Sequence, residues 1–360
     1  MSELSHKVAQ WVRTEIRDIA AYHVPDPGDL IKLDAMENPY TWPEAMLTEW
    51  QQLVRDLPVN RYPDPAAKAL TVELRKAMGV PDNMGVLLGN GSDEIIQILA
   101  LALGGSKRVV LAPEPSFVMY KMIATFSGLE YVGVPLNADF SLDMAVMEQA
   151  IQQHDPAVIY LAYPNNPTGN LFDEEEIEAI LKMANGLVVV DEAYHAFAGK
   201  SFMNRLGEFD NLLVMRTVSK LGLAGLRLGL LAGPNEWLNE FDKVRLPYNI
   251  NVMTQAAAEF ALKHIAVFDE QTRLIREERS RLFAEMEKLD GITLYPSAAN
   301  FILFRVPAGR ANAIFDGIKQ RGVLIKNMKV SSGPLADCLR VTVGTQREND
   351  SFLAALREAL

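Results

Sequence analysis

The stretch Thr217-Val218-Ser219-Lys220-Leu221-Gly222-Leu223-Ala224-Gly225-Leu226-Arg227 decides how this chain folds and what chemistry it can carry. An apolar run, 212–216, leads into it and a second apolar run, 228–232, follows it. Lys220 therefore lies at the end of a predicted buried strand. A lysine in such a dry place must be salt-bridged, stay unpaired at a cost in free energy, or be used chemically. The residues at neighbouring strand ends decide between these alternatives.

Short apolar runs alternate with helical patterns on both sides of this stretch. The predicted strands are 86–88, 108–112, 131–134, 157–162, 186–190, 212–216 and 228–232. The helical patterns between them include 93–103, 118–126, 142–152 and 174–184. This alternation predicts an α/β fold, with a mostly parallel seven-stranded sheet covered by helices on both faces. In such sheets ligands bind beyond the carboxyl ends of the strands.

The C-terminal third has a different pattern. A long helical stretch over 251–289 is followed by strands at 292–294, 301–305, 323–326 and 339–343, with helices at 312–320 and 349–360. We therefore expect a large domain over 36–250 and a smaller α+β domain over 251–360, with a long linking helix at its start. Residues 1–35 form an N-terminal arm that begins with an amphipathic helix and joins the small domain.

Charge and cysteine content exclude several classes of protein. Lysine and arginine total 35 against 46 aspartate and glutamate residues, a net charge of -11 that argues against nucleic-acid and anionic-membrane partners. The sole cysteine, Cys338, excludes an intrachain disulfide and fits a reducing compartment. The sequence has neither a signal-peptide pattern nor an apolar run of about 18 residues. We expect a cytoplasmic enzyme.

A glycine-rich turn follows the first strand of the sheet. It reads Gly89-Asn90-Gly91-Ser92-Asp93-Glu94 and leads into a helix, whose first N–H groups can bind a phosphate. The dinucleotide-binding fingerprint is excluded because Glu94 stands where its third glycine is required. The alternative is a structural turn in which Ser92 caps the helix.

Two further strand ends carry polar groups. The loop Tyr163-Pro164-Asn165-Asn166-Pro167-Thr168-Gly169 follows one strand and presents Asn166 as a side-chain donor. Asp191 ends a run of valines, where a carboxylate is costly unless it meets a cation. That cation is either a structural arginine or a pyridinium N–H, and Tyr194 can return toward the same pocket.

These residues make a set. Lys220 can form an imine, Asp191 can pair with a pyridinium nitrogen, Asn166 can donate to a ring oxygen, and Ser92 with Arg227 can hold a phosphate. The combination predicts a site for pyridoxal 5′-phosphate and requires no metal.

With these residues in view, the sequence resembles the fold-type I pyridoxal-phosphate aminotransferases and, among them, the histidinol-phosphate aminotransferase group. The resemblance extends over nearly the whole chain. It is carried by Tyr22, Glu37-Asn38-Pro39, Arg61-Tyr62-Pro63-Asp64, Asp191-Glu192-Ala193-Tyr194, the stretch 223–229, Asn249-Ile250-Asn251 and the stretch 339–344. It implies the fold-type I architecture, with a large cofactor domain and a smaller domain.

The resemblance also implies roles for single residues. Lys220 carries the cofactor as an aldimine, Asp191 pairs with the pyridine nitrogen, and Asn166 and Tyr194 hold the ring hydroxyl. Tyr120 is expected to stack on the ring, its alternative being a core aromatic. The phosphate cup is expected from Gly91, Ser92, Asp93, Thr217, Ser219 and Arg227.

Substrate and partner expectations follow from the same resemblance. Arg340 binds the substrate's anionic group with help from Tyr22, Asn38 and Lys326. Tyr62 reaches the phosphate of the neighbouring subunit's cofactor, which implies a homodimer with shared sites. Two positions depart from the family: Lys326 stands where many relatives have arginine, and Met36 where they often have a polar residue.

The implied reaction transfers an amino group between histidinol phosphate and 2-oxoglutarate or glutamate, in histidine biosynthesis, by a ping-pong mechanism through Lys220. The alternatives are an aminotransferase for aromatic or other amino acids, and a decarboxylase of phosphothreonine. A non-catalytic regulator of this fold is a third alternative. Such regulators carry a basic extension, and residues 1–30 are too short and too mixed in charge to be one.

Overall fold

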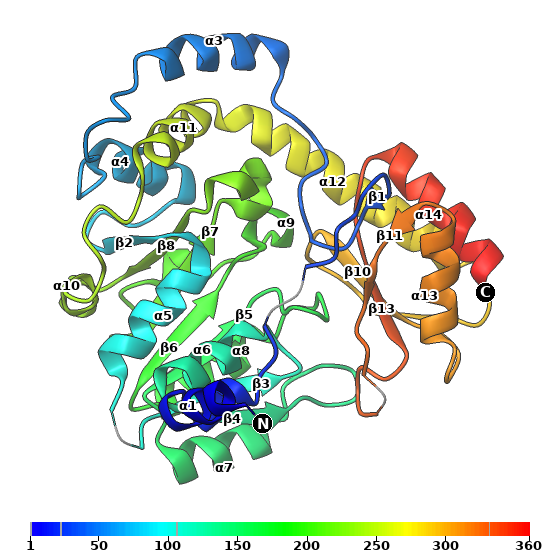
Figure 1. The fold of residues 1–360 in the computed structure, drawn as a ribbon, viewed down its shortest axis with the longest axis horizontal. Coiled ribbons are helices and arrows are strands. Elements are labelled where there is room, and N and C mark those ends of the chain that lie inside the picture. The colour runs from blue at the N-terminus through cyan, green and yellow to red at the C-terminus, as the bar shows by residue number, and fades with distance from the viewer. Residues whose placement is uncertain (1, 22–23, 106, 331) are drawn as a thin grey trace.

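A seven-stranded sheet forms the centre of the larger part of the molecule in a computed structural model, which describes residues 2–21, 24–105, 107–330 and 332–360 (Figure 1). The strand order is β2-β8-β7-β6-β5-β3-β4, and β8 runs antiparallel to both of its neighbours. The strands are β2 (Gly85–Gly89), β3 (Val109–Glu114), β4 (Glu130–Pro135), β5 (Val158–Ala162), β6 (Leu187–Asp191), β7 (Leu212–Thr217) and β8 (Gly229–Gly233). The predicted mostly parallel sheet is confirmed.

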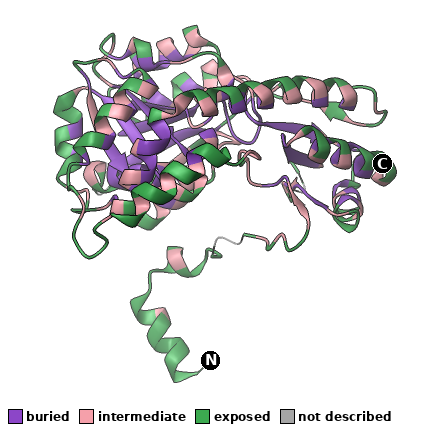
Figure 2. Ribbon diagram, turned by 90° about the horizontal axis from the view of Figure 1, so that it is seen from above, coloured by how far each residue is buried: buried purple, intermediate pink, exposed green. Residues whose placement is uncertain are grey.

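Helices cover both faces of this sheet. One face packs against α5 (Gly91–Leu103), α6 (Met119–Ser127) and α10 (Asn235–Asp242). The other packs against α4 (Lys68–Met78), α7 (Met144–His154), α8 (Glu174–Met183) and α11 (Val252–Lys263). The five inner strands are buried on both sides, whereas the edge strands β2 and β4 include half-buried or exposed residues (Figure 2). That burial explains why the inner strands read as continuous apolar runs in the sequence.

Alternation along β6 assigns its side chains to the two faces. Leu187 and Val189 belong to the core under α5 and α6, whereas Val188 and Val190 belong to the core on the opposite face. Because successive side chains of a strand point to opposite sides, Asp191 continues the α5/α6 face and Glu192 the other. This fixes the surroundings of both carboxylates.

The smaller part is built on a four-stranded antiparallel sheet of order β12-β13-β10-β9. Its strands are β9 (Thr293–Leu294), β10 (Phe301–Arg305), β12 (Lys326–Asn327) and β13 (Cys338–Thr342), and its helices are α12 (Ile265–Met286), α13 (Ala311–Gln320) and α14 (Gln346–Ala359). The predicted α+β pattern is confirmed, with one difference: the expected strand 323–326 is divided at Ile325 into β11 (Val323–Leu324) and β12.

The N-terminal arm pairs with this smaller part, since β1 (Ile31–Lys32) lies parallel to β11. The long helical stretch divides at His264 into α11 and α12. Helix α11 packs on α4 and on α3 (Glu44–Arg55) of the larger part, and α12 runs on toward the smaller one (Figure 1). The domain boundary at residue 250 stays a prediction.

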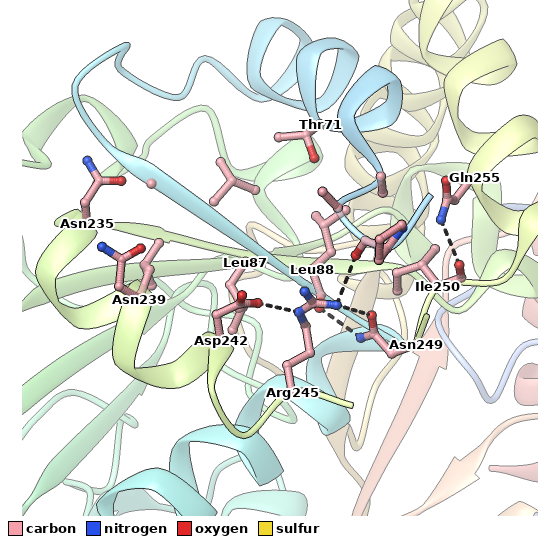
Figure 3. Close-up of a pocket in the computed structure, with 16 residues that line it drawn as sticks. Thr71, Leu87, Leu88, Asn235, Asn239, Asp242, Arg245, Asn249, Ile250 and Gln255 are labelled. Atoms are coloured by element: carbon pink, nitrogen blue, oxygen red, sulfur yellow. Dashed lines mark hydrogen bonds and ion pairs between the residues drawn. The ribbon is translucent and has the colours of Figure 1, made fainter. Parts of the chain in front are cut away.

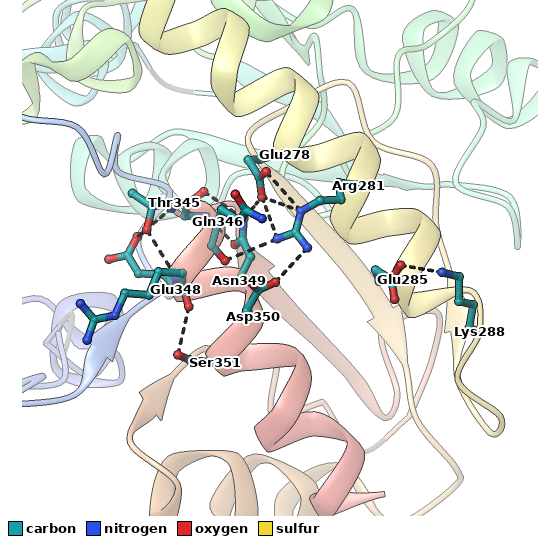
Figure 4. Close-up of polar contacts among 12 residues, drawn as sticks. Glu278, Arg281, Glu285, Lys288, Thr345, Gln346, Glu348, Asn349, Asp350 and Ser351 are labelled. Carbon is teal, nitrogen blue, oxygen red and sulfur yellow. Dashed lines mark hydrogen bonds and ion pairs between the residues drawn. The ribbon is translucent and has the colours of Figure 1, made fainter.

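Polar contacts hold α14 and the end of β13 against α12 (Figure 4). Arg281 forms ion pairs with Glu278 and Asp350, at 2.9 and 2.8 Å. Asn349 is fully buried, donates to Glu278 and bonds both backbone groups of Gly344, just beyond β13. These contacts fix the strand that carries Arg340.

The first residues form two exposed helices, α1 (Glu3–Trp11), which stands off from the body (Figure 2), and α2 (Thr14–Arg17), which contacts α6. Arg13 donates a hydrogen bond to the Phe126 carbonyl of α6. The remaining short elements are α9 (His195–Ala198), η1 (Met203–Arg205), η2 (Ser219–Leu223) and η3 (Ala224–Leu226). Within the described ranges, no helix combines the length and apolar character needed to cross a membrane.

Candidate active site

A cavity of about 140 Å³ opens beyond the carboxyl ends of β5, β6 and β7, with the first turn of α5 on one side. Most of the residues predicted for the cofactor line it: Ser92, Asp93, Asn166, Asp191, Tyr194, Thr217, Ser219, Lys220 and Arg227. Positions spread over more than 130 residues of sequence thus meet at one edge of the sheet, as the rule for parallel sheets requires.

Lys220 lies on the helical turn η2, directly after β7. Its Nζ donates to the Ala35 carbonyl at 3.2 Å and lies 5.8 Å from the centre of the Tyr194 ring. Burial lowers the pKa of Lys220 to about 8, and the nearby positive charges of Arg340 and Arg227 act in the same direction. A useful fraction of the amine is therefore neutral, and nucleophilic, near neutral pH.

Asp191 ends β6 with a nearly buried carboxyl group. It accepts hydrogen bonds from the Tyr120 hydroxyl at 2.6 Å and from the Ala193 N–H at 3.1 Å. These are the donors that the described residues supply to Asp191, and both are neutral. Burial raises the pKa of Asp191 to about 6. Such a carboxyl group is suited to a cationic N–H supplied by a ligand.

The alternative expected for Asp191 is a structural arginine partner. The structure pairs that arginine with the next residue, Glu192. Glu192 is fully buried and accepts from Nε and Nη2 of Arg216 at 2.9 and 2.7 Å, with Ser201 as a further donor. Arg216 also donates to the Met78 carbonyl. This buried pair ties the end of β6 to the end of β7, and so holds Asp191 in register with the Lys220 turn.

The prediction that Tyr120 stacks on the cofactor ring is wrong in this structure. Tyr120 is fully buried in the first turn of α6, its ring stacks on Tyr160 at 4.6 Å, and its hydroxyl holds Asp191. Phe117, which precedes the helix, lines the cavity instead. The reason is local: the loop before α6 faces the cavity, while the first helical turn faces the sheet.

Asn166 connects the two parts of the molecule. Its Nδ2 donates to the Tyr194 hydroxyl at 3.1 Å, and its Oδ1 accepts from Arg340 Nη1 at 2.5 Å. Arg340 also donates to the Asp34 carbonyl and lies over the Phe301 ring at 5.1 Å. The guanidinium of the smaller part thus reaches the edge of the cavity.

Lys326 lies directly opposite Arg340 in the register of β12 and β13. Burial, followed by the charge of Arg340, lowers the pKa of Lys326. Two cations in adjacent strands concentrate positive charge, and their contact with an anionic part of the substrate stays a prediction.

The predicted phosphate cup also assembles. Gly91 has a φ of +78° and begins α5, and a Cβ built on it would lie 2.6 Å from Arg227 Nη2. Arg227 contacts Ser219 Oγ at 3.5 Å and Asp93 at 3.3 Å. Small residues, hydroxyls, a helix N-terminus and a guanidinium lie together, which suits a bound phosphate.

Two predicted residues, Asn38 and Tyr62, lie outside the cavity. Asn38 donates to the Leu221 carbonyl and to Gln271, each at 3.0 Å, and does not line the cavity. One N–H of its amide holds the Lys220 turn and the other holds α12, and a contact between Asn38 and the substrate stays a prediction. Tyr62 is 81% exposed and stacks on Tyr248. Tyr22 lies outside the described residues.

The chemistry of the cavity fits pyridoxal phosphate. The aldehyde of the cofactor requires an amine, which Lys220 supplies. Its pyridinium N–H requires a carboxylate that is not already paired with a protein cation. Asp191 meets this requirement, because among the described residues its hydrogen-bond donors are neutral. A phosphate requires the glycine-lined cup, which a Cβ at Gly91 would fill. All three requirements are met in one cavity.

Comparison with known proteins agrees with this chemistry. Residues 28–356 match the family described as aminotransferase class I and II. The chain is 57% identical over 351 residues to histidinol-phosphate aminotransferase 2 of Nitrosococcus oceani, covering 98% of both, and 55% identical over 354 residues to that of Cupriavidus pinatubonensis, covering 97% of this chain and 96% of the relative. A crystal structure of histidinol-phosphate aminotransferase from Sinorhizobium meliloti in complex with pyridoxal 5′-phosphate superposes with a TM-score of 0.85 at 25% identity, covering 97% of each chain. This chain therefore belongs to the class I and II aminotransferases and, within them, to the histidinol-phosphate aminotransferase family.

Proposed function

We propose that this aminotransferase uses pyridoxal 5′-phosphate to move the amino group of histidinol phosphate to 2-oxoglutarate, a step of histidine biosynthesis. The observation that carries the proposal is a pair of cations: Arg340 bonds to Asn166, which lines the Lys220 cavity, and Lys326 lies opposite Arg340 on the neighbouring strand. A phosphate monoester carries up to two negative charges, and two cations match it better than one. The activity named for the relatives supports the same donor.

Different residues of the chain have different roles in the reaction. The bound cofactor supplies an electron sink for the electrons left behind when the substrate loses its α-proton. Lys220 holds the cofactor covalently at rest, and its freed amine then takes the proton from the substrate's Cα. Asp191 accepts the N–H of the ring, and Tyr120 orients Asp191.

The two half-reactions share one anion site. Arg340 and Lys326 bind the phosphate of the amino donor in the first half and a carboxylate of 2-oxoglutarate in the second. Because both anions use the same cations, they cannot be bound together, which gives a ping-pong order. Asn166, bonded to both Arg340 and Tyr194, keeps the anion site in register with the cofactor's ring hydroxyl.

A half-reaction screen tests the amino donor. Holoenzyme mixed with histidinol phosphate, without a keto acid, should lose its visible absorbance in a single turnover, and 2-oxoglutarate should restore it. Histidinol, which lacks the phosphate, should react with a KM about tenfold higher or more. Lys326→Met should raise KM for histidinol phosphate by a similar factor and change KM for phenylalanine less.

The same screen contains the contradicting outcomes. A faster reaction with phenylalanine or tyrosine than with histidinol phosphate would replace the proposed donor. Release of carbon dioxide from phosphothreonine would show that the enzyme is a decarboxylase and not an aminotransferase.

A homodimer is part of the proposal. Tyr62 and Tyr248 form an exposed stacked pair with ring centres 4.5 Å apart, and α1 exposes Leu4, Val8 and Trp11. A second copy of the chain that covers these apolar groups would bring Tyr62 to the partner's cofactor phosphate. Light scattering should give twice the mass of one chain, and a fully active monomer would contradict this.

The enzyme is placed in the cytoplasm, with small-molecule substrates and no nucleic-acid or membrane partner. The net charge of -11 and the buried free thiol of Cys338 support this placement. Fractionation that finds the protein in membranes or outside the cytoplasm would overturn it.

A further inference from the structure

We propose that Glu94 and Asn249 form a clamp that draws the Asn90 side chain away from the N-terminus of α5, and so leaves the first N–H groups of that helix to the cofactor phosphate. The clamp rests on the proposed function, because the group it serves is the phosphate of pyridoxal phosphate. Glu94 and Asn249 are thus positioning residues, since neither lines the cofactor cavity.

The starting observation is the behaviour of Asn90. It occupies the N-cap position of α5, and asparagine is among the residues that cap helices best, by accepting from N–H groups of the first turn. In the part of the chain that the structure describes, the Asn90 side chain makes no such bond. It donates instead to the backbone carbonyl of Asn249 at 2.8 Å and to Glu94 at 3.2 Å.

Glu94 is the centre of the clamp. One carboxylate oxygen, Oε2, accepts from the backbone N–H of Asn90 at 2.6 Å, from Asn90 Nδ2 at 3.2 Å and from Asn249 Nδ2 at 2.8 Å. The carboxylate therefore holds both the backbone and the side chain of Asn90, the residue directly before the phosphate cup. A charged acceptor of three N–H groups makes stronger bonds than a neutral one.

Asn249 is itself held in one orientation (Figure 3). Its Oδ1 accepts from Arg245 Nη1 at 2.9 Å, and Arg245 is fixed by an ion pair with Asp242 at 2.6 Å. The amide oxygen is thereby engaged, so Nδ2 points to Glu94 and to the Leu88 carbonyl. This gives a function to the Asn249-Ile250-Asn251 motif, in which Asn251 caps α11.

The consequence is competition for the same N–H groups. If the clamp opens, Asn90 is free to cap α5 and occupies donors that the phosphate needs. A clamp variant should therefore lose affinity for pyridoxal phosphate but not for pyridoxal, which has the aldehyde and the ring without the phosphate. A variant that only loosens the fold would weaken both.

The test is a titration of the full-length protein, after removal of its cofactor, with pyridoxal phosphate and with pyridoxal, read by absorbance. Glu94→Leu should raise the dissociation constant for pyridoxal phosphate about tenfold and change that for pyridoxal less than about twofold. Asn249→Ala, a milder change, should raise the dissociation constant for pyridoxal phosphate about threefold. Adding Asn90→Ala to either variant should recover most of the lost affinity, because the competing side chain is gone.

Asn239→Ala is the matched control. Asn239 lines the same outer cavity as Asn249 (Figure 3) and, within the described residues, makes no hydrogen bond to the cup. Its variant should bind both compounds as the parent does.

The inference is overturned if pyridoxal phosphate and pyridoxal weaken together, if neither changes, or if Asn90→Ala fails to restore affinity in both clamp variants. Should Glu94→Leu not fold, Asn249→Ala with and without Asn90→Ala decides alone. A failure of the proposed function would show in the parent protein as an absence of covalent capture, which separates the two.

Discussion

Replacing Lys220 with Ala should abolish the covalent attachment of pyridoxal phosphate and lower kcat by about 10⁴-fold or more. The loss combines the anchoring amine with a general acid–base contribution of about 10²–10⁴. Attachment is measured by borohydride reduction followed by mass spectrometry of the Lys220 peptide. Turnover is measured as glutamate formed from histidinol phosphate and 2-oxoglutarate.

Lys326→Ala provides the comparison, since it removes a second half-buried lysine from the same region. That variant should keep the covalent attachment and change KM instead. If Lys220→Ala turns over at the parent rate, or if reduction attaches the cofactor to another lysine, the assignment of Lys220 fails.

The pH dependence of capture follows from the ionisation of Lys220. Its pKa is lowered to about 8, first by burial and then by Arg340. Only the neutral amine attacks the aldehyde, so the rate of cofactor capture should rise with pH through a midpoint near 8.

The lowered pKa of Lys220 also affects the stability of the fold. Between about pH 8 and 10.5 the unfolded chain binds more protons at this site than the folded chain. The cofactor-free protein therefore regains stability from Lys220 as pH rises through that window.

Much of the fold was predictable because the buried strands are short apolar runs separated by helical patterns. The chemistry at the strand ends was predictable for a related reason: a lysine or an aspartate after such a run has few inexpensive structural explanations. Asp191 and Lys220 were found in this way, and the cavity brings them together.

The partners of Asp191 and Glu192 show where such prediction stops. Two consecutive carboxylates stand at the end of β6, and the sequence allows an arginine partner for the first. Strand alternation gives Arg216 to the second, Glu192, and leaves Asp191 on the α5/α6 face. Deciding this from sequence required the pairing of β6 with β7, which is a long-range property.

The surroundings of Tyr120 and of Asn38 could not be predicted from the sequence, for different physical reasons. The role of Tyr120 depends on where α6 begins: Phe117, in the loop before the helix, lines the cavity, whereas Tyr120, in the first helical turn, faces the sheet. The partners of Asn38, Leu221 and Gln271, lie far along the chain. No local pattern could have indicated that both amide hydrogens were already used.

Replacing Asp191 with Asn should leave the cofactor bound and slow the reaction by about 10²–10⁴-fold, the range of a general acid–base contribution. A carboxylate favours the protonated ring nitrogen, whereas a neutral amide does not, and an unprotonated ring withdraws electrons from the substrate's Cα less strongly. Loss of the α-proton should then limit the rate, so α-deuterated donor should show a larger isotope effect than in the parent enzyme. Tyr120→Phe, which removes one hydrogen bond to Asp191, should cost only about tenfold.

The same substitution has an opposite effect on the protein without its cofactor. Burial raises the pKa of Asp191 from 3.8 to about 6, so the folded chain holds this proton more tightly than the unfolded chain. The stability contributed by the protonated form is complete below about pH 4 and is lost as pH rises through 6. At pH 7 the cofactor-free Asp191→Asn protein should therefore resist urea better than the parent, by roughly 3 kcal/mol or less. Unchanged turnover together with unchanged stability would show that Asp191 faces no ring nitrogen. Greater stability with severely reduced turnover is the result expected if this carboxylate is kept, at a cost to the fold, for the cation that the cofactor brings.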